Sequence, residues 1–161
     1  MKKLTKKQIF DLQLNYTWIT KLCGDEWWND WQKWRAVSYL NLSDDFIREF
    51  KDNLSWFELT RNHQFTLETV REFQDYIHWD TLSRMRISED IIREFQDKLN
   101  WQFISTYQDL SENFIMEFKD KVQWDEIYVN QNCSKEFWQK TSEYWMPYFE
   151  HLKHRRKDEL R

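Results

Sequence analysis

The sequence predicts an all-α fold, a short α-solenoid of stacked helix–turn–helix repeats with divergent capping units, and three observations support this prediction. Tryptophan recurs at spacings of 22, 23, 22 and 23 residues, and the segments that precede these residues resemble one another. The 161 residues include one glycine and one proline, so helices can occupy nearly all of the chain. A fixed period of about 20–50 residues is typical of arrays in which each unit buries its apolar face against its neighbours. The periodic residues are Trp34, Trp56, Trp79, Trp101 and Trp124.

The repeated segment reads LSDDFIREFKDNLSW, FTLETVREFQDYIHW, ISEDIIREFQDKLNW and LSENFIMEFKDKVQW. In the third copy, Ser88 precedes two acidic residues, a pattern typical of a helix N-cap followed by a first turn that favours carboxylates. The apolar residues that follow have the spacing of an amphipathic helix: Ile91, Ile92, Phe95 and Leu99. Each repeat is therefore expected to contain a helix of about ten residues, a tight turn, and a helix of about seven residues that begins at the Trp.

The turns between these helices cannot depend on glycine. Where a turn needs a positive φ angle, we expect Asn or Asp to supply it, and Asn100 stands at one such break. Helices this short are marginal in water by themselves, so packing between units must stabilise them. We interpret each periodic Trp as a buried spacer between the two helices and the next unit. The alternative is a row of rings on which nucleic-acid bases stack.

The chain is predicted to be a single helical-repeat domain, 1–161. Residues 1–41 form divergent capping units, 42–132 form four regular repeats, and 133–161 form a C-terminal cap with a basic tail. The first cap contains Trp27, Trp28, Trp31 and Trp34, which would lie on one helix face. Such a stripe is typical of a core, although exposure would make it a partner site.

The net charge of −4 is unevenly distributed. Residues 1–7 hold four Lys, residues 151–161 hold five Lys or Arg against two acids, and residues 8–150 hold 15 basic against 26 acidic side chains. A negative body repels phosphates and attracts basic surfaces. We therefore expect a protein partner with a basic surface, with nucleic acid as the less favoured alternative, bound through the basic termini and aromatic residues.

No stretch approaches the roughly 18 apolar residues of a membrane span, so no membrane association is expected. The first residues, MKKLTKKQIF, lack the apolar region of a signal peptide, and two cysteines do not form a disulfide framework. An intracellular, cytoplasmic location is the expectation. Cys133 occupies the same position in its repeat as Leu110, and is expected to be buried.

Catalytic patterns are missing from the sequence. There is no glycine-rich phosphate loop. Of the four histidines, His151 and His154 could share a helix face, but no Cys or carboxylate with ligand spacing completes a metal site. We therefore expect no catalytic residues, no metal site and no cofactor, and a protein that is not an enzyme.

Two surfaces are candidates for partner binding. The first is an acidic ladder, in which pairs of carboxylates three residues apart recur on the first helices; it is either a solvated face balanced by nearby Lys and Arg or a strip that docks a basic groove. The ladder consists of Glu49, Asp52, Glu72, Asp75, Glu94, Asp97, Glu117 and Asp120.

The second candidate surface lies on the second helices, whose sequences differ from repeat to repeat. Varied residues on a uniform scaffold are what a repeat protein uses to select a partner, although an indifferent face would vary as well. Aromatic and Arg side chains are the expected anchors. The candidates are Phe57, Arg61, Arg84, Phe103 and Tyr107.

The segments SEDIIREFQDKLNW and SENFIMEFKDKVQW resemble tandem repeats of 22–23 residues, of the form LSxxFIxEFxDKxxW, in proteins of large DNA viruses, phages and bacteria. The resemblance covers residues 42–132. It implies a helical interaction scaffold without enzymatic activity. By analogy, it implies a viral or phage inhibitor that blocks a host nucleic-acid-handling or defence protein through its acidic surface.

Overall fold

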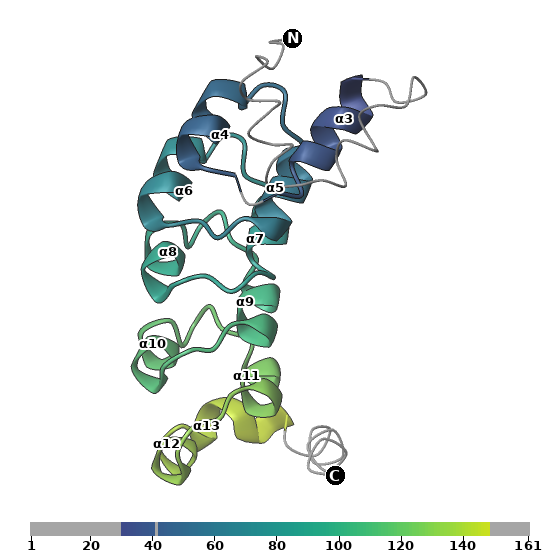
Figure 1. The fold of residues 1–161 in the computed structure, drawn as a ribbon. Helices are drawn as coiled ribbons and strands as arrows, with labels where there is room; N and C mark the ends of the chain where they lie inside the picture. The colour runs from purple at the N-terminus through teal and green to yellow at the C-terminus, as the bar shows by residue number, and fades with distance from the viewer. Residues whose placement is uncertain (1–29, 41, 149–161) are drawn as a thin grey trace. The chain divides into compact units, whose positions relative to one another are not determined.

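The computed structural model describes residues 30–40 and 42–148 of the chain. The regular secondary structure of these residues is helical, with no β-strand among them. They form eleven α-helices and one 3-10 helix (Figure 1). The expectation of an all-α protein is confirmed for this part of the chain. Two compact units are present, Met1–His78 and Trp79–Arg161. The single domain and its divisions after residues 41 and 132 stay predictions.

Each unit contains helices of two kinds. The first helices are those that precede a periodic Trp or occupy the same position in the repeat, and the second helices carry that Trp. Within each unit the two kinds form two layers in Figure 1. The described part of the first unit contains α3 (Asp30–Val37), α4 (Asp44–Phe50), α5 (Trp56–Asn62) and α6 (Leu67–Phe73). The second contains α7 (Trp79–Leu82), α8 (Glu89–Glu94), α9 (Trp101–Tyr107), α10 (Glu112–Glu117), α11 (Trp124–Asn130), α12 (Lys135–Lys140), α13 (Ser142–Trp145) and η1 (Met146–Tyr148). The first helices are α4, α6, α8, α10 and α12, and the second helices are α3, α5, α7, α9 and α11.

Each first helix begins after a hydroxyl residue that caps it. The hydroxyl oxygen accepts a hydrogen bond from the backbone N–H three residues later, which satisfies one of the unpaired donors of a helix start. The predicted cap at Ser88 is confirmed, with Ile91 as its donor. The same bond forms at the other four first helices, whose caps are Ser43, Thr66, Ser111 and Ser134.

The prediction that the second helix begins at the Trp is confirmed for α5, α7, α9 and α11. The first helices have six or seven residues, so the expected length of about ten was wrong. After α8 the chain tightens, and the Phe95 carbonyl accepts from the N–H groups of both Lys98 and Leu99. The indole N–H of Trp101 then donates to the Gln96 carbonyl at 3.0 Å. This bond closes the turn that shortens the helix.

The turns use no positive φ angle at any residue of the described ranges, so the expectation for Asn and Asp was wrong there. Asn100 has a φ of −87° and instead caps α9 through its side-chain oxygen, which accepts from the N–H groups of Gln102 and Phe103. Asn100 therefore starts α9 by capping it, after α8 has ended at Glu94.

The periodic Trp rings pack against the following repeat. Their predicted burial is confirmed for Trp34 and Trp124, at 7% and 8% exposed, and was wrong for the other three, which are half-buried. In four cases the ring packs against a Phe of the following first helix or its last turn, with ring centroids 5.1–5.3 Å apart. Each of these rings is therefore partly covered by a neighbouring aromatic side chain. The pairs are Trp34 with Phe50, Trp56 with Phe73, Trp79 with Phe95, and Trp101 with Phe118.

A buried hydroxyl four residues after the Trp makes a second link between repeats. It accepts from the backbone N–H of the residue just before the next Trp, as Ser105 does from Gln123 at 2.9 Å. Each of these hydroxyl residues is fully buried. An N–H that faces the core without a partner would be costly, so the hydroxyl ties the segment before the next Trp to the preceding second helix. The other links join Ser38 to Ser55, Thr60 to His78, and Ser83 to Asn100.

A buried glutamine seven residues after the Trp adds a third link in the second unit. The side-chain oxygen of Gln108 accepts from the Ile87 N–H at 3.1 Å, and its nitrogen donates to the carbonyls of Ser83 and Met85. Gln131 makes the same three kinds of hydrogen bond one repeat later. The glutamine side chain therefore gives hydrogen-bond partners to backbone groups that have none within a helix.

We predict that Trp101→Ala lowers the free energy of unfolding by about 3–5 kcal/mol, because it removes a large ring from between two repeats. Chemical denaturation followed by far-ultraviolet circular dichroism measures the change. Trp31→Ala is the matched control, because Trp31 is 62% exposed, and it should cost below about 1 kcal/mol. Equal losses for the two variants would contradict the spacer role.

We predict that Ser105→Ala lowers the free energy of unfolding by about 1–3 kcal/mol, because it leaves the Gln123 N–H buried without its acceptor. The neighbouring Thr106→Ala removes a half-buried hydroxyl that bonds only within its own helix, to the Gln102 carbonyl. The same denaturation measurement should give a smaller loss for Thr106→Ala. A neutral Ser105→Ala would show that the buried hydroxyl does not join the repeats.

Candidate interaction surfaces

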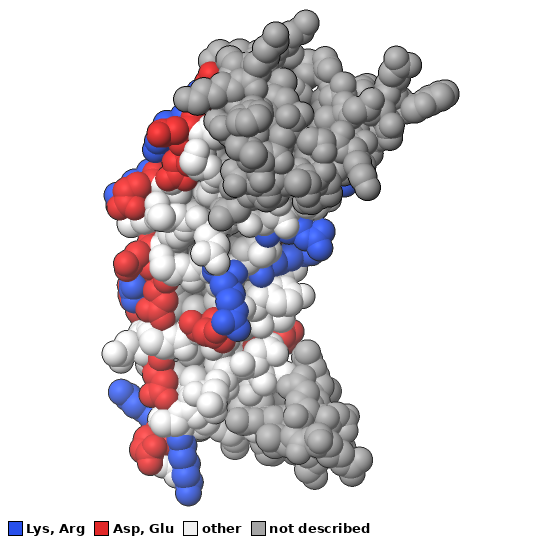
Figure 2. Space-filling model, in the orientation of Figure 1, with Lys and Arg blue, Asp and Glu red and all other residues white. Residues whose placement is uncertain are grey.

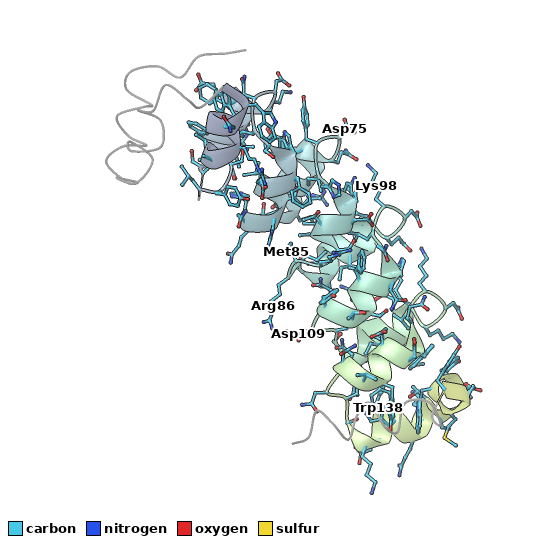
Figure 3. All side chains as sticks on the ribbon, turned by 90° about the vertical axis from the view of Figure 1, so that its right-hand side faces the viewer. Asp75, Met85, Arg86, Lys98, Asp109 and Trp138 are labelled. Atoms are coloured by element: carbon cyan, nitrogen blue, oxygen red, sulfur yellow. The ribbon has the colours of Figure 1, made fainter. Side chains whose placement is uncertain are left out.

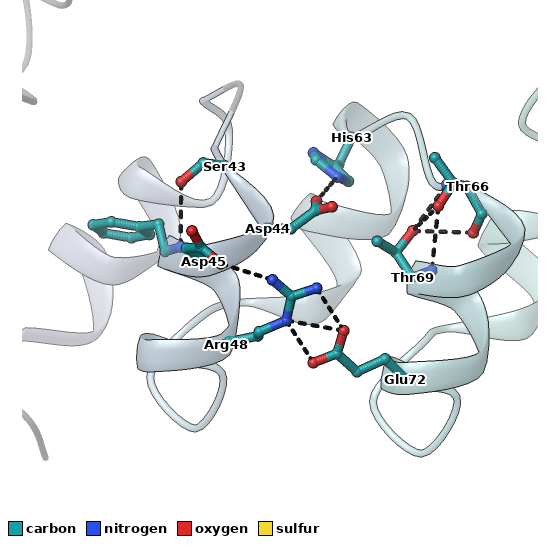
Figure 4. A network of polar contacts seen from close by, with 9 residues as sticks. Ser43, Asp44, Asp45, Arg48, His63, Thr66, Thr69 and Glu72 are labelled. Carbon is teal, nitrogen blue, oxygen red and sulfur yellow. Dashed lines mark hydrogen bonds and ion pairs between the residues drawn. The ribbon is translucent and has the colours of Figure 1, made fainter.

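All eight residues of the acidic ladder are exposed. In the first unit, Arg48 of α4 reaches Glu72 of α6, with Nε and Oε1 2.7 Å apart and Nη2 and Oε2 2.9 Å apart (Figure 4). Arg48 also contacts Asp45 on its own helix at 2.7 Å. The Tyr76 hydroxyl donates to Asp52 at 3.0 Å. Ladder carboxylates of the first unit therefore bind side chains of the neighbouring repeat.

The second unit repeats this pattern. Arg93 of α8 contacts Glu117 of α10 at 2.9 Å, and Lys121 contacts Asp97 at 3.0 Å. The view in Figure 2 shows acidic and basic atoms side by side along the edge formed by the first helices. The Arg48 guanidinium holds the pKa of Glu72 below its usual value, so this ladder member stays ionised and paired at neutral pH. Ion pairs of this kind reduce the charge that the ladder offers to a partner.

The structure brings together three of the five candidates on the second helices. The guanidinium carbon of Arg84 lies 3.9 Å from the centroid of the Phe103 ring, well within cation–π range. The Phe103 and Tyr107 rings are 6.2 Å apart, and Tyr107 is 53% exposed. Arg84 follows α7 whereas the two aromatic residues belong to α9, so the cluster spans two repeats. We call Arg84, Phe103 and Tyr107 the Arg84 cluster.

The other two candidates lie on α5 in the first unit. Phe57 is 48% exposed and meets the ring of His78 edge-on, with centroids 5.4 Å apart. Arg61 is exposed on the same helix, one turn later. Tyr39, which has the same position relative to its Trp as Arg61, is 44% exposed. Tyr39 was not among the candidates, although sharing the repeat position of Arg61 could have identified it as one.

Exposed large hydrophobic side chains have a clear distribution among the described residues. Trp31, Tyr39, Phe57 and Tyr107 lie on second helices or within two residues of one, Met146 and Tyr148 lie on η1, and none lies on a first helix. Trp31 was expected to belong to a packed indole stripe, and its exposure shows that this part of the expectation was wrong. Trp27 and Trp28 of that stripe lie outside the described residues.

One variable position of the second helices proves to be interior. Glu58 is 2% exposed, and one of its carboxylate oxygens accepts two hydrogen bonds from Arg35, at 2.8 and 2.7 Å. Variation along the repeat is therefore not by itself a sign of exposure.

A groove of about 560 Å³ lies beside α12 and α13 in the second unit. Cys133 borders it and is half-buried, so the expectation of a buried thiol was wrong. The remaining lining residues are Lys135, Trp138, Gln139, Ser142 and Trp145.

Within the described part of the chain, no group of His, Cys, Asp and Glu side chains is arranged to hold a metal ion. None of the described helices has the length and apolar content to cross a membrane. No protein-family model, curated protein or solved structure matches the chain. The resemblance to viral and bacterial repeats stays a prediction.

His63 occupies the position of Gln108 and Gln131 in its own repeat. Its Nε2 lies 3.5 Å from the Asp44 carboxylate (Figure 4). Burial lowers the pKa of His63 below 6.5, and the opposing effect of Asp44 does not restore it. The folded state therefore favours the neutral imidazole.

We predict that His63 makes the protein less stable in acid. Between pH 6.5 and the lower pKa of the folded state, the unfolded chain binds more protons at this residue. The free energy of unfolding should therefore fall as the pH drops through this window, and the loss should level off below the folded-state pKa. His63→Gln, which introduces the residue found at Gln108 and Gln131, should remove this part of the pH dependence in denaturation curves. The control is His78→Gln, at an exposed histidine of the same unit, and a profile unchanged by His63→Gln would contradict the prediction.

Proposed function

We propose that the protein is a non-enzymatic protein-interaction module, built as a short solenoid of helix pairs, and that its second helices carry the contact surface. The observation that carries this proposal is that the described first helices carry no exposed large hydrophobic side chain, whereas Trp31, Tyr39, Phe57 and Tyr107 lie on second helices or just after one.

The solenoid arrangement is supported by links that recur in each unit. The Trp–Phe contact and the buried hydroxyl bond join one repeat to the next in both units. Because every link connects neighbouring repeats only, a linear stack satisfies all of them.

The second helices fit a contact surface better than the acidic ladder does. Binding hot spots are rich in Tyr, Trp and Arg, and the exposed residues of this layer include Trp31, Tyr107 and Arg84. Ladder residues such as Glu72 and Glu117 already pair with arginines of the neighbouring repeat. A basic partner would have to compete with these arginines. The expectations of a basic partner surface and of an inhibitor of host defence stay predictions.

The alternative function is nucleic-acid binding. The basic ends, residues 1–7 and 151–161, lie outside the described residues. All five periodic Trp rings pack against neighbouring aromatic side chains, so more exposed aromatic residues, such as Tyr107, are the better candidates for base platforms.

A phage-displayed library of random peptides, selected against the immobilised protein, tests the proposal. We predict that the wild-type protein enriches a small set of related peptides. The double variant Phe103→Ala with Tyr107→Ala should lose at least about tenfold in affinity for them, because aromatic anchors carry a large share of binding energy. Fluorescence anisotropy with the enriched peptides measures this.

The matched control removes two ladder charges without changing shape, through Glu94→Gln with Asp120→Asn. This variant should keep its affinity within about twofold, a difference that surface charges produce. Loss of binding in the control alone would identify the ladder as the site. Failure to enrich any peptide, together with salt-sensitive binding of a fluorescent oligonucleotide, would favour the alternative function.

A further inference from the structure

Arg84 contacts an aromatic ring without an ion pair to a described carboxylate, and in this it differs from four other arginines of the described residues. The guanidinium groups of four arginines each form an ion pair with a carboxylate: Arg35, Arg48, Arg86 and Arg93. Arg84 forms none with any residue that the structure describes, and it lies over an aromatic ring instead. Its N–H donors are therefore available to a partner.

We propose that Arg84 binds a side-chain carboxylate of a partner peptide, while an apolar residue next to that carboxylate packs on Tyr107. This inference rests on the proposed function and names the partner chemistry of the second helices in the second unit.

The geometry suits a carboxylate. A guanidinium is planar, presents its donors at its edge, and can stack its face on an aromatic ring. Phe103 lies 3.9 Å from the guanidinium carbon of Arg84, which limits the conformations of the long side chain before a partner arrives. A carboxylate can then accept two parallel hydrogen bonds from the held group. Preorganisation of this kind reduces the entropy lost on binding.

Tyr107 supplies the neighbouring apolar contact. Its ring lies 6.2 Å from that of Phe103, and Tyr107 is 53% exposed at the last position of α9, a helix in which Ile104 and Ser105 are buried. A rigid ring beside a held guanidinium resembles the aromatic and Arg pairs that dominate interfaces. The partner segment should therefore combine Asp or Glu with an adjacent aromatic or aliphatic residue.

The local charge favours a single carboxylate over a chain of phosphates. The second helices of the second unit and the segments that follow them, residues 79–88, 101–111 and 124–134, carry two cations, Arg84 and Arg86, and four carboxylates. Arg86 is already paired with Asp109 at 3.3 Å, and Figure 3 shows both side chains projecting from the same side of the ribbon. A polyanion gains affinity from several available cations along its path, whereas one carboxylate needs one guanidinium.

The test uses the same kind of peptide library, fused to the coat protein through the peptide's C-terminus, so that only side chains offer carboxylates. We expect peptides enriched on the wild-type protein to carry Asp or Glu next to an apolar residue. Replacing that acid by its amide in a synthetic peptide should weaken binding by about tenfold to a hundredfold, the loss typical of a charge-assisted pair.

Arg84→Gln and Arg86→Gln form a matched pair of variants, because both remove one exposed arginine from the same loop. Arg84→Gln should weaken the acidic peptide by a similar factor, and should bind the amide peptide as the wild-type protein does. Arg86→Gln should change either affinity by less than about threefold, as expected of an exposed charge. Arg84→Lys should recover only part of the affinity, because an ammonium group is not a planar fork. Thermal unfolding of each variant checks that the fold is retained.

The outcomes separate this inference from the proposed function. Enrichment of related peptides without an acidic residue, or equal effects of Arg84→Gln and Arg86→Gln, would overturn the carboxylate site while leaving the interaction module in place. Failure to enrich any peptide would contradict the proposed function itself. A fluorescent oligothymidylate that binds through Arg84 more tightly than the acidic peptide would replace the carboxylate with phosphate and overturn the inference.

Discussion

The structure depends on the join between a second helix and the first helix that follows it. Helices of four to eight residues gain too few internal hydrogen bonds to offset the entropy of ordering them. The join supplies what they lack in two ways. The Trp ring buries apolar area against the next Phe, and the hydroxyl four residues later takes a backbone N–H that would otherwise be buried without a partner. The ring alone would leave the backbone N–H without an acceptor, and the hydroxyl alone would leave apolar area between the repeats uncovered.

This join divides the residues of a second helix by position. The Trp, the apolar residue three positions later and the hydroxyl after that face the interior, as at Trp101, Ile104 and Ser105. The residue six positions after the Trp is exposed in three repeats, at Asn62, Tyr107 and Asn130, whereas Leu40 is buried at the same position. Where this position is exposed, substitutions change the surface without touching the contacts that hold neighbouring repeats together. The surface can therefore vary there while the stacking contacts stay the same.

The sequence predicted the elements whose signals are local. The cap at Ser88 and the helix start at Trp101 each depend on a few adjacent residues, and both were confirmed. The buried hydroxyls were missed, although Ser and Thr recur four positions after the Trp, because their role appears only when the partner of each buried N–H is sought. The Arg84–Phe103 contact was also inaccessible to sequence reasoning. It depends on the lateral register between adjacent repeats, which periodicity alone does not define.

Register also decides which side chain each arginine meets. On the first helices, Arg48 and Arg93 meet a glutamate 24 residues later, so the charge is balanced within the array. Arg35 on α3 and Arg86 after α7 also pair with carboxylates. Arg84 instead meets Phe103, 19 residues later, and the aromatic ring attracts the cation without using its hydrogen-bond donors. An arginine that pairs with a carboxylate has little left to offer a partner, whereas one held by a ring alone keeps both its charge and its donors. The carboxylate binding that we propose for Arg84 therefore depends on which side chain the register places opposite the guanidinium, and not on the net charge of the protein.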